Sequence, residues 1–233
     1  LVTTKGGEEE PYSFYNVEKT FKLVQVNSFE KLSKISFLPR LVAGVKFSKD
    51  ADVIYTRWLL AAFVLILLRK KNIIFEYHHF ATSFVNRMIE NLVTKSNGVI
   101  RHIFITNALK EDFFNVYPIL KEKDTLVLPD GADIICSEPC LIDDSKSLSC
   151  GYIGSFQKGK GVDIVVKIAE KTPSMKFHIV GGTEDEISIL KSKTKAPNIV
   201  WHGFLDQKKA IEILKRDIDI ALFSAGGSIT EKL

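Results

Sequence analysis

The strongest constraint on the fold is a regular alternation of short apolar segments and amphipathic segments from residue 150 onward. The apolar runs predict strands, and the segments between them carry apolar residues at helical spacing. Strands joined by helices run parallel, because each crossover returns the chain to the same edge of the sheet. This half is therefore predicted to be a doubly wound sheet. The expected strands are residues 151–154, 176–180, 198–202 and 218–223, and the expected helices are 162–171, 184–193 and 207–216.

The first half repeats this alternation with longer helices, so the sequence predicts an α/β protein with two parallel sheets in series. Turn-forming residues interrupt the pattern between residues 133 and 149, which predicts a domain boundary there. We take residues 1–143 as the first domain and 144–233 as the second. The expected strands of the first half are 52–56, 72–77, 102–106 and 125–129, and its helices are 58–69, 83–94 and 108–116.

Composition excludes several classes of protein. The chain has 45% hydrophobic and 26% charged residues, which is typical of a globular protein and not of a disordered one. The net charge of +4 is spread along the chain, so a nucleic-acid partner is not expected, whereas a phosphate ligand or an anionic membrane surface is. The cysteines, only 3 in number, are too few for a disulfide framework and have no histidine at zinc-site spacing. They predict a reduced, cytoplasmic protein.

The longest apolar run covers residues 58–68 and is followed directly by Arg69, Lys70 and Lys71. It is too short to span a bilayer, which takes about 20 apolar residues. A buried helix is the expected identity, with a helix dipping into the membrane as the alternative. The chain begins at Leu1 within a predicted strand and ends at Leu233 within a predicted helix, so we expect it to be truncated at both ends.

The strongest local signal for ligand binding is the run GSFQKGKG at residues 154–161, between the first strand of the second half and the next helix. Glycines allow close approach of a ligand, the helix offers unpaired N–H groups, and lysine adds positive charge. Such a loop is suited to a diphosphate, although a glycine-rich turn of this kind is as often only a tight connection. Gly181, Gly182 and Gly203 end the next two strands at the same edge of the sheet, where open α/β sheets bind nucleotides.

These motifs together resemble glycosyltransferase family four, whose members have the GT-B fold of two Rossmann-like domains facing a cleft. Residues 154–161 match the family's G-R-L-x-x-x-K-G loop, and residues 198–203 match its N-V-x-F-x-G strand. In the first half, residues 76–78 resemble the E-x-H motif of the acceptor side. Residues 105–107 resemble the I-T-N/S strand, and residues 129–133 the P-[ND]-G-[VA]-D segment. The resemblance covers nearly the whole chain.

The resemblance assigns roles to residues of the donor side. Lys160 matches the lysine that contacts the donor diphosphate, and Ser155 stands where the family usually has arginine. A serine donates one hydrogen bond but carries no charge, so its phosphate contact is weaker. Lys158 is a compensating contact in one interpretation and a solvated loop residue in the other. The diphosphate site is predicted to comprise Gly154, Ser155, Lys160, Gly161, Gly226 and Gly227, and the nucleotide site Gly181, Gly182, His202 and Gly203.

The same resemblance predicts His78 as the catalytic residue facing the transferred sugar, with Glu76 beside it. Imidazole can hydrogen-bond a sugar hydroxyl without a metal. His79 remains unassigned, and His102 and His178 are interpreted as structural. Gly227 occupies the position of the first glutamate of the family's E-x(7)-E motif, and the second lies beyond the chain. Lys232, in a segment resembling S-P-x-K-L, is a further candidate sugar or phosphate contact.

The resemblance implies a retaining hexosyltransferase that uses no metal or other cofactor and moves a sugar from a nucleotide diphosphate to a glycan or lipid-linked acceptor. The sequence shows no Asp-x-Asp at the carboxyl end of a predicted strand, in keeping with this. Two alternatives stay open. One is a nucleotide-sugar-binding module without turnover, suggested by Ser155 and Gly227, and the other is a sugar-nucleotide 2-epimerase. We expect a cytoplasmic enzyme, attached peripherally to the inner face of a membrane.

Overall fold

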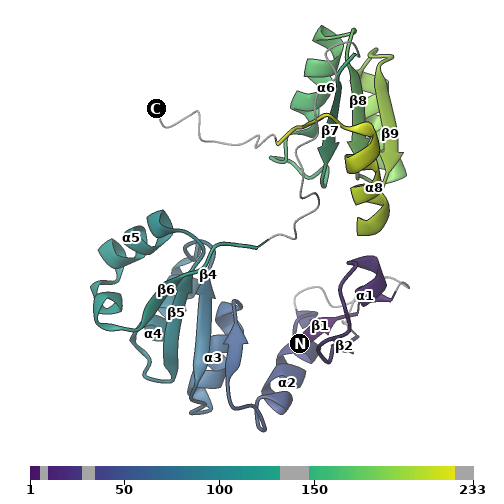
Figure 1. Ribbon diagram of the computed structural model, residues 1–233. Helices are drawn as coiled ribbons and strands as arrows, with labels where there is room; N and C mark the ends of the chain where they lie inside the picture. The colour runs from purple at the N-terminus through teal and green to yellow at the C-terminus, as the bar shows by residue number, and fades with distance from the viewer. Residues whose placement is uncertain (6–9, 28–34, 132–146, 224–233) are drawn as a thin grey trace. The chain divides into compact units, whose positions relative to one another are not determined.

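The computed structural model describes residues 1–5, 10–27, 35–131 and 147–223. The chain forms two compact units, one of residues 1–7 and 20–132 and the other of residues 8–19 and 133–233 (Figure 1). The boundary predicted at residue 143 lies outside the described residues. Each unit is built on its own parallel sheet.

The first unit has a four-stranded parallel sheet in the order β3-β4-β5-β6. Its strands are β3 (Ile54–Thr56), β4 (Ile73–Tyr77), β5 (Val99–Phe104) and β6 (Thr125–Val127). A separate parallel pair is formed by β1 (Val2–Thr4) and β2 (Val24–Val26). The helices of this unit are α2 (Leu38–Phe47), α3 (Leu59–Leu67), α4 (Phe84–Lys95), α5 (Asn107–Val116) and the 3-10 helix η2 (Pro118–Glu122).

Aromatic rings fill the core of the first unit. Tyr77 on β4 stacks on Phe104 of β5 with ring centroids 4.8 Å apart, and Phe113 of α5 packs 4.7 Å from Tyr77. His102 is fully buried beside them, with its Nδ1 2.9 Å from the Tyr77 hydroxyl. Burial lowers the pKa of His102 to about 4, so its ring is neutral at neutral pH. His102 thus has the structural role expected from the sequence.

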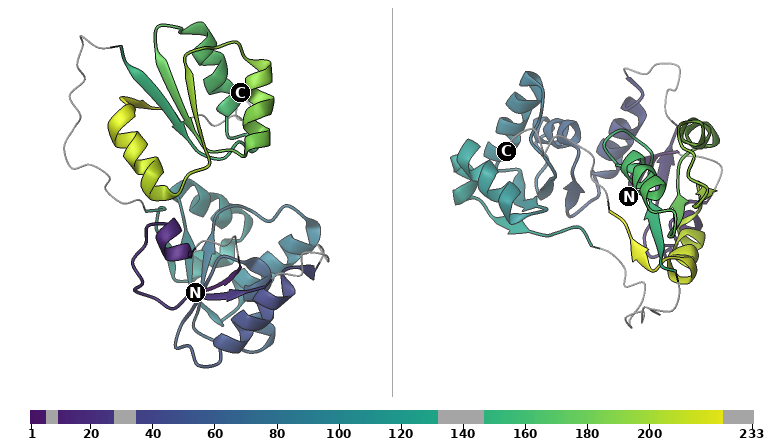
Figure 2. Two further views of the ribbon diagram at one scale, coloured as in Figure 1. Left: turned by 90° about the vertical axis from the view of Figure 1, so that its right-hand side faces the viewer. Right: turned by 90° about the horizontal axis from the view of Figure 1, so that it is seen from above.

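The second unit has the strand order β10-β7-β8-β9, again all parallel. Its elements are α1 (Pro11–Phe14), β7 (Ser149–Ile153), α6 (Val162–Lys171), β8 (Lys176–Val180), α7 (Glu184–Lys193), β9 (Ile199–Gly203), α8 (Gln207–Asp217) and β10 (Ile220–Ala221). Figure 2 shows α8 on one face of the sheet and α6 and α7 on the other. The packing follows the strand alternation, because Phe177 and Ile179 join the α6 cluster whereas Val180 packs with α8 residues. The predicted doubly wound α/β class is confirmed.

Side-chain caps place the helices of the second unit. Thr183 and Glu186 form a capping box at the start of α7, in which the side chain of each residue accepts a hydrogen bond from the backbone N–H of the other. Asp206 caps α8 by accepting a hydrogen bond from the Lys209 N–H at 2.9 Å. These helices begin at residues 184 and 207, as the sequence predicts.

The apolar run of the first half forms α3, whose inner face is part of the core. Ala62 and Leu65 are buried there, which confirms the buried-helix interpretation for this face. Leu67 and Leu68 are 64% and 52% exposed at the helix end, next to the exposed Arg69. Among the described residues, no helix has the length and apolar character needed to cross a membrane.

Candidate functional site

The glycine-rich loop connects β7 to α6 at the carboxyl edge of the second sheet. Gly161 is the residue that precedes the first turn of α6, and its φ of 77° is in the left-handed region. Gly159, with φ of 91°, forms part of the turn before it. Both positions therefore favour glycine. The loop leads to the start of a ten-residue helix whose first turn has no side-chain cap, and such helix ends favour anions.

Tyr152 fixes the shape of this loop from below. Its hydroxyl donates to the Ser155 carbonyl at 2.8 Å and lies 3.3 Å from the Lys160 carbonyl, so one side chain ties both ends of the loop together. Burial raises the pKa of Tyr152, which keeps the hydroxyl protonated as a donor. A Cβ on Gly154 would lie 3.0 Å from this hydroxyl. The loop conformation is thus built into the fold.

The paired glycines after β8 leave room for the loop. A Cβ on Gly181 would lie 1.9 Å from the Gly154 carbonyl oxygen, and one on Gly182 would lie 2.3 Å from the Phe156 ring. Phe156 packs against the core beneath the loop, with its ring 6.4 Å from that of Trp201. Gly181 and Gly182 are the predicted nucleotide contacts, and here they also have an internal packing role.

The polar side chains of the loop are on its outer side. Ser155, Lys158 and Lys160 are all exposed, between the buried Tyr152 and the buried Gly161. Their positions agree with a loop that presents hydroxyl, ammonium and backbone N–H groups to an anion. The assignment of each to the donor diphosphate remains a prediction.

The two histidines of the second sheet form a pair on the face covered by α8. His178 Nδ1 lies 3.0 Å from His202 Nε2, and their rings stack with centroids 5.2 Å apart. Burial lowers the pKa of both rings, and their mutual repulsion lowers that of His178 further. His178 is structural, as expected. The contact with His178 engages Nε2 of His202. The role of His202 in binding a nucleotide remains a prediction.

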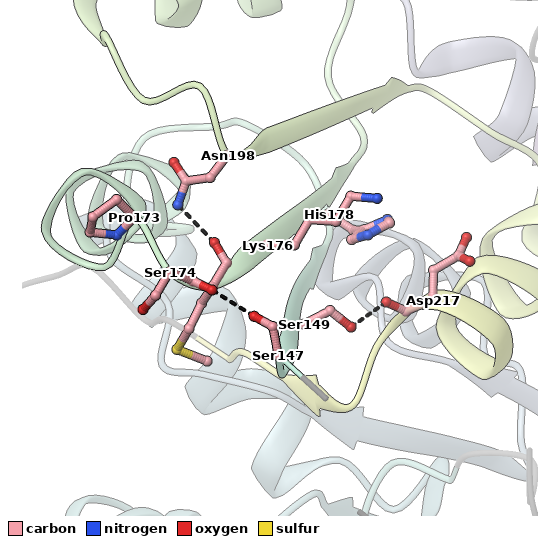
Figure 3. A pocket seen from close by; sticks show the side chains of 9 residues that line it. Ser147, Ser149, Pro173, Ser174, Lys176, His178, Asn198 and Asp217 are labelled. Atoms are coloured by element: carbon pink, nitrogen blue, oxygen red, sulfur yellow. Dashed lines mark hydrogen bonds between the residues drawn. The ribbon is translucent and has the colours of Figure 1, made fainter. Parts of the chain in front are cut away.

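A cavity of about 490 Å³ lies at the opposite, amino-terminal edge of the second sheet (Figure 3). Its hydroxyl groups are used within the protein, because Ser147 donates to the Ser174 carbonyl at 2.6 Å and Ser149 to the Asp217 carbonyl at 2.5 Å. Open parallel sheets bind ligands at their carboxyl edge, where the glycine loop lies. The loop, and not this cavity, is therefore the candidate ligand site of the second unit.

The first unit positions His78 directly after β4. Its Nε2 pairs with Glu76 Oε1, and the two side chains are 25% and 16% exposed. A carboxylate at this position orients the imidazole ring. The neighbouring His79 is exposed, and its Nδ1 lies 2.9 Å from the Phe80 carbonyl oxygen. The structure thus separates the two adjacent histidines, and only His78 has a carboxylate partner among the described residues.

Asp130 follows β6 at the carboxyl edge of the first sheet, and the sequence alone assigned no role to it. It lies with Glu76 and His78 so that the metal-binding atoms of the three side chains are all within 4.8 Å of one another. Asp130 belongs to the segment that resembles P-[ND]-G-[VA]-D, and this was the available signal. Tyr152 and Phe156 were also missed, because a tyrosine in a strand and a phenylalanine in a loop carry no pattern of their own.

Three of the predicted site residues, Gly226, Gly227 and Lys232, lie outside the described residues. Their assignments to the donor sugar and phosphate remain predictions. The described part of the donor side consists of the loop after β7 and the ends of β8 and β9.

Comparison with solved structures identifies the fold. Anabaena HepE, crystallised with UDP and glucose, is 15% identical, with a TM-score of 0.60 over 88% of this chain and 60% of HepE. Sucrose-phosphate synthase from Thermosynechococcus elongatus is 17% identical, with a TM-score of 0.60 over 92% of this chain and 61% of that one. The lipopolysaccharide outer core galactosyltransferase WaaB is 17% identical, with a TM-score of 0.57 over 89% and 60%.

These likenesses confirm the GT-B type of fold predicted from the sequence. The chain spans about 60% of the length of each of these three proteins. No protein-family model matches the sequence, and comparison with curated proteins gives no match.

The packing of the loop predicts unequal effects of alanine at two glycines that share a φ of 73°, Gly182 and Gly203. A Cβ at residue 203 would meet only Ile187, at an ordinary contact distance of 3.9 Å, so Gly203→Ala should cost only the left-handed backbone penalty of about 1–2 kcal/mol. Gly182→Ala also crowds Phe156, which should add about 1–3 kcal/mol. Denaturant unfolding followed by Trp201 fluorescence, with Trp58→Phe in every protein, measures the difference. Equal losses for the two variants would show that Phe156 does not constrain Gly182.

Proposed function

We propose that the protein transfers a hexose from a nucleotide-diphosphate sugar to an acceptor. The observation that carries this proposal is the β7–α6 loop, which presents glycines, Ser155 and Lys160 at the start of a helix and at the carboxyl edge of a parallel sheet. Backbone N–H groups, a helix dipole and an ammonium group together favour a diphosphate at that position.

The departure of the nucleotide diphosphate is the step that this loop would assist. Negative charge builds up on the leaving phosphate as the bond to the sugar breaks, and donors fixed in advance stabilise that charge. The Tyr152 hydroxyl lies 2.8 Å from the Ser155 carbonyl oxygen and 3.3 Å from that of Lys160. These contacts hold the loop backbone, with its N–H donors, in place without a ligand. We infer that Lys160 and the α6 N-terminus supply this stabilisation, and that transfer is retaining and requires no metal or other cofactor.

His78 is assigned to the sugar that is transferred. Its pairing with Glu76 fixes one ring nitrogen and leaves the other to contact a hydroxyl or the developing charge of the reacting sugar. The acceptor belongs to the glycan or lipid-linked class in this proposal. WaaB is named as a lipopolysaccharide galactosyltransferase, and HepE was crystallised with UDP and glucose, which supports a nucleotide-sugar donor here.

A binding module without turnover is the second candidate, because Ser155 is uncharged where the resembling family carries arginine. The epimerase alternative requires carboxylates acting as acid and base, whereas the first turn of α6 carries a single one, the exposed Asp163. Incubation with labelled nucleotide sugars separates the three: transfer yields a new glycoside, epimerisation a changed sugar nucleotide, and a binding module neither product.

Lys160→Ala should weaken the binding of nucleoside diphosphates by about 1.5–3 kcal/mol, because it removes a charge-assisted contact to phosphate. Calorimetry with UDP, GDP and ADP on the whole chain measures this loss. Lys167, exposed on α6 beyond the loop, provides the control, and Lys167→Ala should leave affinity unchanged. Equal affinities of wild type and Lys160→Ala for every nucleotide would remove Lys160 from the site.

His78→Ala should lower kcat about 100-fold or more while changing nucleotide affinity little, because interactions made mainly in the transition state appear in kcat. The measurement is transfer of labelled sugar, alongside calorimetric nucleotide binding. His79→Ala should retain the rate, since that neighbouring residue is exposed and its ring lies against the Phe80 carbonyl oxygen rather than against Glu76. A variant in which affinity and rate fall together would place His78 in donor binding.

Peripheral attachment to an anionic membrane through the end of α3 completes the proposal. Leu67 and Leu68 are exposed there, followed by exposed Arg69 and Lys71. Each basic residue near such a surface contributes about 1 kcal/mol, and salt screens the attraction. The protein should sediment with anionic vesicles at low salt, and Arg69→Glu with Lys71→Glu should release it. Recovery in the supernatant at low salt would leave a cytoplasmic enzyme without membrane attachment.

A further inference from the structure

Three side chains capable of binding a metal meet at the carboxyl edge of the first sheet. Glu76 and His78 come from the end of β4, and Asp130 comes from the segment after β6, which lies two strands away in the sheet. Their metal-binding atoms are all within 4.8 Å of one another. Residues distant in sequence thus supply one imidazole nitrogen and two carboxylates around a single point.

The environment of this cluster, defined as Glu76, His78 and Asp130, favours a cation. The inner pair is sheltered, with side chains 25% exposed for His78 and 16% for Glu76, whereas Asp130 is exposed at the opening. No lysine or arginine among the described residues forms an ion pair with either carboxylate. In this part of the chain, the two carboxylates therefore have no lysine or arginine ion pair that a metal ion would have to break.

We propose that the cluster binds a divalent transition-metal ion of the zinc class. Imidazole is a ligand that zinc and related metals prefer, whereas magnesium and calcium take oxygen ligands almost exclusively. Zinc lies about 2.0–2.2 Å from nitrogen and oxygen ligands, so neighbouring ligands of a tetrahedral ion are roughly 3.3 Å apart. To reach that spacing, the contact between Glu76 and His78 has to open and the exposed Asp130 side chain has to approach the other two. Three protein ligands leave a fourth position open to water.

This inference does not rest on the transfer reaction proposed above, although both involve His78. Metal binding can be measured directly, and a protein that binds zinc without transferring sugar would leave the present inference intact while removing the proposed function.

The test is titration of the tag-free chain with Zn²⁺ by calorimetry, and with Co²⁺ by visible absorption, which reports the coordinating atoms. Cys136→Ser and Cys140→Ser are introduced into every protein so that these thiolates do not contribute. The protein that carries only these two substitutions, called wild type in this test, is expected to bind one equivalent of Zn²⁺ in the micromolar range. Mg²⁺ under the same conditions should bind far more weakly.

His78→Ala and Asp130→Asn should each weaken Zn²⁺ binding at least about tenfold, since even loss of an outer contact to a metal ligand costs 10–100-fold. Asp130 is exposed, so Asp130→Asn should keep the fold. It provides the decisive measurement if His78→Ala does not fold. The controls are His79→Ala, next in sequence, and Asp112→Asn, exposed on α5; both should bind like wild type. Absence of zinc binding by wild type, equal losses in the controls, or equal affinity for Mg²⁺ would overturn the proposal.

Discussion

The approach of the Gly154 carbonyl to Gly181 is the contact on which the glycine-rich loop of the second unit depends. A single methyl group at residue 181 would lie 1.9 Å from that oxygen, so the β7–α6 loop can take its present course only over a glycine. Phe156 makes the same demand of Gly182. Gly181 and Gly182, which the proposed function assigns to ligand binding, are thus also required for the packing of the loop. Packing and ligand binding would therefore place glycine at the same edge of the sheet.

The first unit reaches its own functional edge by a different route. Its aromatic core, centred on Tyr77 and Phe104, fixes β4 and β5, and strand alternation then places Glu76 on the side opposite to Tyr77. His78 follows within hydrogen-bonding reach of Glu76. The packing of Tyr77 in the core and the placement of Glu76 and His78 are therefore set by the same few residues of one strand.

Periodicity and caps made most of the fold predictable. The helices 162–171 and 184–193 have the predicted bounds, because apolar spacing and the Thr183 capping box are local signals. Strand 218–223 was predicted too long and is observed as Ile220–Ala221, since strand ends depend on pairing with β7 rather than on local sequence. Asp130 could not be joined to His78 from sequence, because their proximity follows from the order of β4, β5 and β6 in the sheet.

The tyrosine beneath the glycine loop has a consequence for how a nucleotide would associate. Ordering a flexible backbone costs about 1–2 kcal/mol per residue, and a loop that becomes ordered only around its ligand loses that amount from its affinity. Tyr152 orders residues 155–160 during folding, through its bonds to the Ser155 and Lys160 carbonyls. Encounter with a diphosphate should then be limited by diffusion and desolvation, with no slow rearrangement of the loop before capture.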